Sequence, residues 1–372
     1  MHSCNEVKFR NPKYVQIDFL KFVFSIVILL HHSYKLPSFN GVHYILQSGA
    51  LSVDFFFIVS GYFMMKKVSS FPFINSNMIL RESIRYISHT YARIFPFVLL
   101  SYFLGTMILL IYKNSIDLFL RILSSSIFEL SGTFMFGLKG YYINSLTWFI
   151  SAMIIAKFII YPVALKYREL LTMYIAPILV FICLGFYSQN YGCLGGTFDF
   201  FGGVYVGVYR AIMGILTGCI IFKAVEVLNI NIKDHCPVEP KIMRTLLTYL
   251  QCLVIFIILF YMQVMKQGRG DFIIYFVFCM LIIISLLIET NYSYGVMNRL
   301  RTINDKWHFG KLSLSIYLTQ NIFFILFKLG IRMNMLSEVC LYIIGTFILS
   351  IISIKFINNI EVEKFMLRRY KL

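Results

Sequence analysis

The composition of this 372-residue chain is that of a membrane protein and excludes an ordinary soluble domain. Of its residues, 59% are hydrophobic and only 14% are charged, whereas soluble domains have about a quarter charged residues. The net charge of +17 does not predict nucleic-acid binding, because the basic residues form short clusters between apolar runs. The eight cysteines show no CxxC pairing, so neither a disulfide framework nor a metal site is expected.

Apolar runs of about 18 to 22 residues recur from end to end and predict membrane-spanning helices. A segment in lipid must satisfy its own backbone hydrogen bonds, so the expected fold is an all-α polytopic helical bundle. We expect one membrane-embedded domain over residues 1–372. The ten predicted spans cover 17–34, 49–65, 94–112, 146–165, 170–187, 208–223, 246–263, 272–288, 312–328 and 338–356.

The distribution of Lys and Arg predicts that both termini are cytoplasmic. With this orientation 23 of these residues fall in inside segments and eight in outside segments, as the positive-inside rule requires. The first run follows Lys8, Arg10 and Lys13 and resembles a signal peptide. No small-x-small cleavage site follows it, so we interpret it as an uncleaved span.

Three connections between the spans stand out. Residues 66–93 are predicted to form a basic cytoplasmic loop. Residues 113–145 form the longest outside connection, in which Phe119–Leu138 is apolar enough for a re-entrant or interfacial segment. Residues 188–207 are rich in Gly and aromatics and lack Lys and Arg. They could form a sugar-binding lip, but an aromatic interfacial belt with flexible turns is the favoured interpretation.

The first span carries Asp18 and Lys21 near its start and His31 and His32 at its end. Ionisable residues in membrane helices are costly and therefore predict function. Lys21 and His32 are eleven residues apart, about three helical turns, so both can face one cavity. This favours a phosphate-binding cation and a histidine base. Alternatively, Lys21 snorkels to the interface and His32 caps the helix.

Asp54 lies near the outer end of the second span, at a depth comparable with that of His32. A carboxylate there could hold the imidazole in one tautomer and stabilise its cation. The alternative is a capping or loop-anchoring role. Ser60 and Gly61, in the same span, are interpreted as a close helix-packing pair.

The third span is predicted to begin at Arg93-Ile94-Phe95-Pro96. Pro96 suits the first turn of a helix, and the guanidinium of Arg93 could bind phosphate with two hydrogen bonds. The alternative is positive-inside anchoring, which we prefer for Arg81 and Arg85.

Three later segments carry weaker signals. Trp148, in Leu-Thr-Trp-Phe, is typical of an interfacial belt. Arg210 lies near the outer end of its span and could snorkel, and Gly214 with Gly218 forms a small-xxx-small packing face. Gln320 ends a segment that begins at Phe309.

In this order the segments resemble the acyltransferase 3 family of integral membrane acyltransferases, over roughly residues 16–325. The resemblance rests on Lys21 with His32, on Phe56 to Gly61, on Arg93 to Pro96, on the Leu-Thr-Trp-Phe span start, and on the GKLSLSIYL segment. Two positions depart from the family. Its first basic residue is commonly Arg, and Lys21 binds phosphate only as a point charge. Its late histidine is Gln320 here, which keeps only hydrogen bonding.

The resemblance implies transfer of an acyl group, usually acetyl, from cytoplasmic acyl-CoA to a hydroxyl of a glycan. Exopolysaccharide, capsule, lipopolysaccharide or a lipid-linked precursor would be the acceptor, in a bacterial inner membrane. Acyl-CoA would be a co-substrate, with no bound cofactor, metal or nucleic acid.

Within that scheme Lys21 and Arg93 bind the CoA phosphates, and His32 acts as general base or as a transient acyl acceptor. Asp54 orients His32. Further residues with a substrate or structural role are Asp18, Ser60, Trp148, Arg210 and Gln320. One alternative is a transporter or flippase in which the same charges line a path. We see no repeat-related interrupted helices, and this favours the enzyme. A weaker alternative is a scaffold for polysaccharide assembly.

Overall fold

The computed structural model describes residues 14–42, 45–71, 74–138, 140–235, 239–291, 296–330 and 333–359, without the side chains of 231–235, 240 and 296–298. Within these ranges ten helices are long and apolar enough to cross a membrane. This confirms the predicted all-α bundle of ten spans. The basic residues expected before the first span, Lys8, Arg10 and Lys13, lie outside the described residues. The cytoplasmic placement of the termini stays a prediction.

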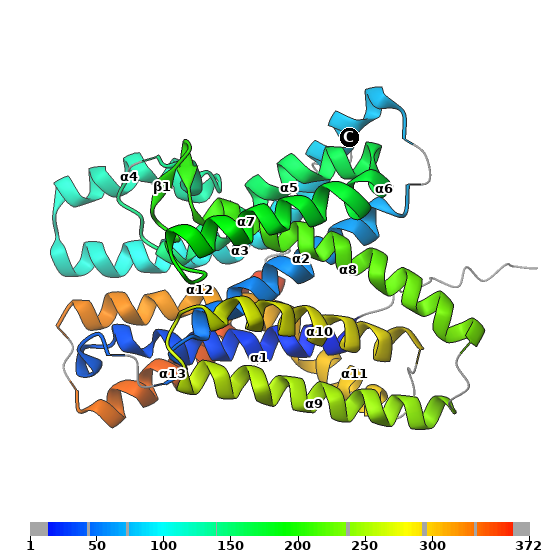
Figure 1. Ribbon diagram of the computed structural model, residues 1–372. Coiled ribbons are helices and arrows are strands. Elements are labelled where there is room, and N and C mark those ends of the chain that lie inside the picture. Colours follow the sequence, from blue (N-terminus) through cyan, green and yellow to red (C-terminus); the bar gives the residue numbers. More distant parts are fainter. Residues whose placement is uncertain are drawn as a thin grey trace, which may run out of the picture.

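The chain is mostly helical. The elements are α1 (Val15–His31), α2 (Ser52–Val68), α3 (Ser76–Lys113), α4 (Ile116–Leu130), α5 (Trp148–Lys166), α6 (Arg168–Leu170), α7 (Ala176–Asn190), β1 (Phe200–Phe201), β2 (Val204–Tyr205), α8 (Gly207–His235), α9 (Pro240–Val264), α10 (Gly270–Asn291), α11 (Val296–Trp307), α12 (Phe309–Lys328) and α13 (Met335–Asn359). In Figure 1, α2 runs between a group with α1, α9, α10, α12 and α13 and a group with α3, α5 and α7. The main packing contacts are those of α2 with α8 and of α1 with α12.

Glycines let α2 and α8 pack closely. A Cβ atom at Gly61 would collide with the carbonyl of Ile215, and one at Gly218 would collide with the carbonyl of Ile58. Only a residue without a side chain fits at these crossings, so the predicted packing role of both glycine motifs is confirmed.

The third span differs from its prediction. α3 covers 38 residues, Ser76–Lys113, so most of the predicted cytoplasmic loop 66–93 is helical. Pro96 is buried inside this helix rather than in its first turn. A membrane helix tolerates an internal proline where neighbouring helices and side chains satisfy the freed backbone groups. Pro96 therefore did not mark the helix start.

Much of the apolar segment Phe119–Leu138, in the connection predicted to lie outside, belongs to the helix α4. Leu118 and Ile122 of α4 are buried, α4 packs on α3, and it is not among the ten spans. The buried carboxylate of Glu129 accepts hydrogen bonds from the backbone N–H groups of Ile143 (2.8 Å) and Asn144 (2.9 Å). These bonds tie α4 to the chain that leads into α5. Burial raises the pKa of Glu129 to about 7.

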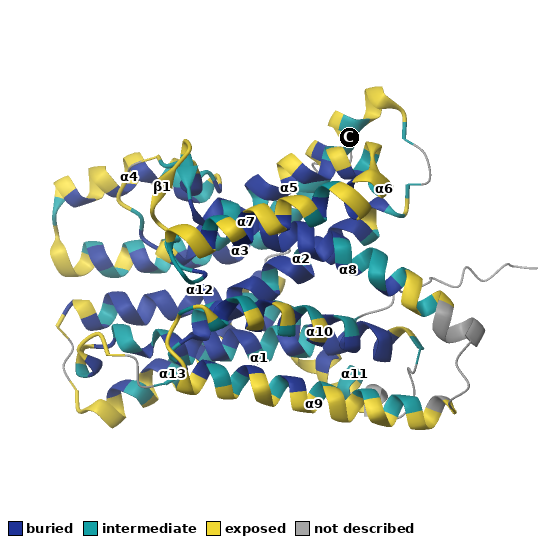
Figure 2. Ribbon diagram, in the orientation of Figure 1, coloured by how far each residue is buried: buried dark blue, intermediate teal, exposed yellow. Residues whose placement is uncertain are grey.

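Burial separates core helices from peripheral ones, as Figure 2 shows. Of the most apolar window of α12, 78% is buried, against 22% for α9. The exposed face of α9 is apolar, with Leu253, Phe256 and Phe260 each more than half exposed. Such a face suits lipid, whereas α12 lies where its polar side chains can meet those of α1.

Candidate functional site

His32 is held by Gln320 of α12. His32 follows α1 directly, in a 3₁₀ turn, His32–Lys35. Its Nδ1 lies 3.2 Å from Oε1 of Gln320. The Nε2 group of Gln320 donates to the carbonyl of Tyr317 at 2.9 Å, and a carbonyl can only accept, so Oε1 must face the imidazole. In the neutral ring Nδ1 therefore carries the proton, and Nε2 keeps the lone pair that a base or nucleophile needs.

A buried tyrosine supports this arrangement. The hydroxyl of Tyr342, on α13, lies 3.1 Å from Oε1 of Gln320 and 3.0 Å from the carbonyl of Leu29. Its single proton serves one acceptor at a time. Contacts with Tyr317 of α12 and Tyr342 of α13 thus hold the side-chain amide of Gln320 in place, and this amide orients the imidazole of His32.

Asp54 has a different partner from the one predicted. Its Oδ1 and Oδ2 accept hydrogen bonds from Nε and Nη2 of Arg210, both at 2.7 Å. The side chains of Asp54 and Arg210 are 1% and 2% exposed, so the pair is buried between α2 and α8. The expected contact of Asp54 with His32 is corrected accordingly, and so is the idea that Arg210 snorkels. Asp54 was predicted to contact His32 because the two residues lie at a similar depth in their spans. The rotation of α2 about its axis instead turns the Asp54 carboxylate toward α8.

Two cavities adjoin inside the bundle. One, of about 290 Å³, contains His31, His32 and Arg210 in its wall, and we call it the His32 cavity. The other, of about 260 Å³, contains Lys21 and Lys157 among mainly apolar side chains, and we call it the Lys21 cavity. The residues shared by both walls are Ile28, Val53 and Tyr317. Lys21 and His32 thus serve adjoining cavities rather than one.

Cations gather at the Lys21 cavity. Nζ of Lys21 lies 3.0 Å from Oδ1 of Asp18. Lys157 of α5 is 5% exposed and lies 5.6 Å from the ring centre of Tyr86. Among the described residues no carboxylate pairs with Lys157. Arg93 is exposed on α3 and is not in the cavity wall, but its charge and that of Lys21 both act on Lys157.

Sequence reasoning assigned no role to Lys157. The available signal was a lysine in the middle of an apolar span, which predicts function by default. With Lys21 and Arg93 nearby and Asp18 as the adjacent carboxylate, this end of the bundle carries an excess of positive charge.

The Gly-rich connection between α7 and α8 also belongs to the site. The stretch Leu194 to Phe198 lines the His32 cavity, and Phe198 packs against Trp148 with ring centres 6.2 Å apart. Trp148 is 8% exposed and lines the same cavity. Trp148 is therefore not a belt residue, and this part of the connection borders the His32 cavity rather than forming only an interfacial belt.

The remaining predicted residues lie around these cavities. Nδ1 of His31 lies 2.8 Å from the carbonyl of Leu46, which holds this buried ring to the following loop. Ser60 lines the Lys21 cavity, and its hydroxyl lies 3.2 Å from the sulfur of Met153. No cluster of three metal-binding side chains occurs among the described residues.

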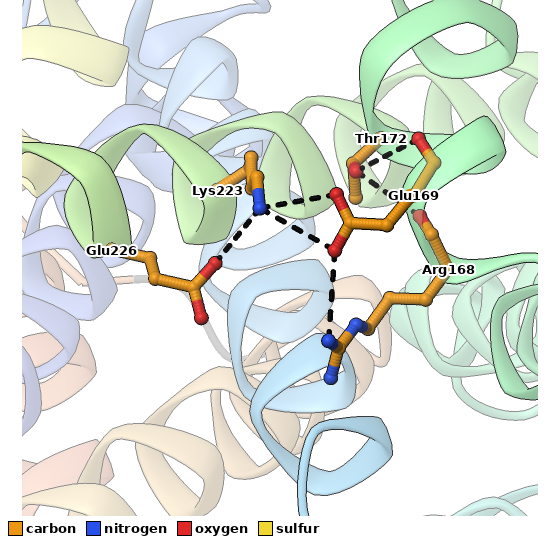
Figure 3. A network of polar contacts seen from close by, with 5 residues as sticks. All are labelled: Arg168, Glu169, Thr172, Lys223 and Glu226. Atoms are coloured by element: carbon orange, nitrogen blue, oxygen red, sulfur yellow. Dashed lines mark hydrogen bonds and ion pairs between the residues drawn. The ribbon is translucent and has the colours of Figure 1, made fainter. Parts of the chain in front are cut away.

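A separate polar network joins α6 and α8 (Figure 3). Nζ of Lys223 lies 3.0 Å from Glu169 and 3.2 Å from Glu226, and Arg168 lies 3.5 Å from Glu169. The two carboxylates are 56% and 42% exposed, and exposed pairs of this kind contribute little free energy. We interpret the network as a connection between helices and not as part of the site.

Comparison with known proteins gives one result. A family model described as an acyltransferase domain matches residues 14–355, which contain both cavities and every candidate residue. Neither the curated proteins nor the solved structures gave a match to this chain.

Proposed function

This chain belongs to the acyltransferase 3 family and is a membrane acyltransferase, and we propose that it transfers an acetyl or related acyl group from acyl-CoA to a glycan hydroxyl. The observation that carries the proposal is the pair of adjoining cavities, one with clustered cations and the other with an oriented histidine. A proton-coupled transporter could also use such a histidine, but membership of this family argues against that alternative.

The Lys21 cavity suits the acyl donor. Coenzyme A carries phosphates at its nucleotide end and the thioester at the end of a long pantetheine arm. Lys21, Arg93 and Lys157 would attract the phosphates. The arm would lie along the apolar wall near Phe56 and Phe149. This end would face the cytoplasm, the source of acyl-CoA, in the orientation that the Lys and Arg distribution predicts.

The thioester would reach His32 where the cavities meet. In the direct mechanism Nε2 of His32 takes the proton of the acceptor hydroxyl, the oxygen attacks the thioester carbonyl, and the C–S bond breaks. The released CoA thiolate then takes up a proton. In the alternative mechanism Nε2 accepts the acyl group first and passes it to the acceptor. Both mechanisms need a lone pair on Nε2 of His32. The contact with Gln320 favours the tautomer that has this lone pair, because it keeps the ring proton on Nδ1.

Other residues would position the site. Gln320 takes over the orienting role first assigned to Asp54. Asp54 and Arg210 would instead join α2 to α8 and fix one wall of the His32 cavity. The acceptor would enter that cavity beside Trp148 and the stretch Leu194 to Phe198, where aromatic faces and backbone groups suit a sugar.

The test is acyl transfer by the purified protein in lipid nanodiscs, with labelled acetyl-CoA and surface glycans extracted from cells that lack the protein. Wild-type protein should label the glycan, and mass spectrometry should find the same acylation in cells that express it. His32→Ala should abolish labelling, and His31→Ala should retain it with lowered thermal stability, because His31 anchors a loop. Absence of labelling by folded wild-type protein, or an inactive His31→Ala beside an active His32→Ala, would contradict the proposal.

A further inference from the structure

A groove with only positive charges in its wall leads away from His32. The His32 cavity shares Tyr34, Lys35 and Ser145 with a second cavity of about 620 Å³. That second cavity shares Asn321 and Lys328, among others, with a third cavity of about 270 Å³. We call this series the lysine groove. It lies where the turn after α1 meets the ends of α3 and α12, on the left in Figure 1.

Three lysines line the groove, one after another along its length. Lys35 lines both the His32 cavity and the cavity of about 620 Å³. Lys328 lines the cavities of about 620 Å³ and about 270 Å³, and Lys113 lines only the latter. Lys35 is half-buried and lies 5.2 Å from the ring centre of Phe324. Lys328 is close enough for its charge to act on that of Lys35. Like charges held together in a concave site repel each other unless an anion binds between them.

The groove offers no acidic side chain to balance these charges. Among the described residues, none that lines the three cavities is Asp or Glu. Arg210 also borders the His32 cavity, but Asp54 neutralises it. None of the three lysines forms an ion pair with a described residue. This differs from the Lys21 end of the bundle, where Asp18 offsets one cation.

We propose that the acceptor is a negatively charged saccharide, whose carboxylate or phosphate groups bind Lys35, Lys328 and Lys113 while a neighbouring hydroxyl lies at His32. Aromatic side chains along the same wall, Tyr34, Phe324 and Tyr142, provide faces on which sugar rings can stack. The inference rests on the proposed function, because it takes His32 as the place where the acyl group is transferred.

An anionic lipid headgroup could also meet exposed lysines near a membrane surface. Two observations favour the saccharide. Lys35 is half-buried and lies between His32 and the open part of the groove, and the groove continues into the cavity that contains His32. A headgroup bound at Lys35 would block that entry. The lipid alternative is retained as an outcome of the experiment.

The experiment measures binding, so that it does not depend on the transfer reaction. Fluorescently labelled tetragalacturonate, its methyl ester, maltotetraose and a phosphorylated maltotetraose are titrated against the protein in phosphatidylcholine nanodiscs. Acetyl-CoA binding is measured on the same samples as a control for folding and for the donor site. We expect at least one charged probe to bind about tenfold or more tightly than its neutral counterpart, and to lose this advantage at high salt.

Charge-removing variants locate the contact. Lys35→Gln should weaken binding of the charged probe about tenfold and Lys328→Gln about fivefold, because the more buried cation is screened less. Neither should change binding of neutral probes or of acetyl-CoA. Lys306→Gln, at an exposed lysine of α11 outside the groove, is the matched control and should bind as wild type does.

Each other outcome has a defined meaning. Equal affinity for charged and neutral probes, or no binding of any probe by protein that binds acetyl-CoA, would overturn the lysine groove and leave the proposed function standing. Charged-saccharide binding without acetyl-CoA binding would support the groove and contradict the donor site. If 30 mol% phosphatidylglycerol abolishes probe binding in wild type but not in Lys35→Gln, the groove binds lipid headgroups and the proposal fails. The probe that binds distinguishes carboxylate from phosphate.

Discussion

Nδ1 of His32 and Oε1 of Gln320 lie 3.2 Å apart where α1 packs on α12. Because the amide is fixed by the carbonyl of Tyr317, this one contact decides which imidazole nitrogen carries the proton in the neutral ring. The first prediction concerns Gln320. Gln320→Leu should lower kcat about 10- to 100-fold, by analogy with the loss seen when the hydrogen-bond partner of a metal-ligating histidine is removed. The KM for acyl-CoA should stay near the wild-type value, since the donor binds at the other cavity.

Two further variants make that prediction specific. Gln320→Glu keeps an oxygen acceptor for Nδ1–H and should retain more activity than Gln320→Leu. Tyr342→Phe removes only the outer hydroxyl and should have the smallest effect. Nitrogen NMR of labelled His32 should show the Nδ1–H tautomer in wild type and a mixture in Gln320→Leu. A normal kcat in Gln320→Leu would show that the contact is not functional.

The second prediction concerns the buried pair of Asp54 and Arg210. Asp54→Asn leaves a guanidinium buried without its counter-charge, so stability should fall by about 3 to 5 kcal/mol. Replacing both, as Asp54→Leu with Arg210→Met, should recover much of this loss, because a matched apolar pair leaves no unpaired charge. The measurement is the thermal unfolding midpoint of each purified variant in detergent. An Asp54→Asn protein with wild-type stability and turnover reduced about 10⁴-fold would instead support a direct orienting role at His32.

The third prediction concerns the cations at the Lys21 cavity. Lys157→Met should raise the KM for acyl-CoA about tenfold or more, because it removes a buried amino group that pairs with no described carboxylate and that a donor phosphate could bind as the ammonium ion. Arg93→Ala should raise it more than Arg93→Lys, which keeps the charge but loses the two-pronged hydrogen bonding. Some loss of kcat is allowed, since remote binding can be coupled to chemistry. Steady-state kinetics with Lys306→Gln as control provide the measurement, and an unchanged KM in folded Lys157→Met would exclude contact with the donor.

The fourth prediction concerns pH and Glu129. Its pKa is raised from 4.5 to about 7 by burial, so between these values the folded state holds a proton that the unfolded state has lost. Stability should therefore be highest below about pH 4.5 and fall as pH rises through 7, by up to about 3 kcal/mol from this group. Thermal unfolding followed from pH 5 to 8 should show this slope.

Glu129→Gln provides the control for that slope. Its amide cannot ionise in this range, so the fall in stability between pH 5 and 8 should be shallower. At the acidic end the variant should be the less stable of the two, because one amide oxygen replaces the two oxygens that bind the N–H groups of Ile143 and Asn144. Parallel pH profiles for the two proteins would mean that Glu129 does not titrate as its burial indicates.

Several features followed from the sequence alone because they depend on local patterns. Apolar length predicted the number of spans, and small residues predicted close helix packing at Gly61 and at Gly214 with Gly218, while the structure showed that these two faces pack on each other. Helical periodicity also predicted Lys21 and His32 to lie about 16 Å apart along the first span, and in the structure the two belong to one continuous helix and its C-terminal end. Proline was a less dependable signal. Pro96 was taken for a helix start, although in lipid a helix can continue through a proline.

The partner of each polar side chain was decided only by the tertiary structure. Depth along a span can be counted from the sequence, but the rotation of each helix about its axis is set by packing against its neighbours. The rotation of the helices turns Asp54 toward Arg210. His32 contacts Gln320 instead, which is 288 residues away in the chain. The rotation also brings Lys157 to the cavity of Lys21 and places Lys35 beside Lys328. The sequence alone determined which chemical groups lie at each end of α1, and tertiary packing determined which of them meet.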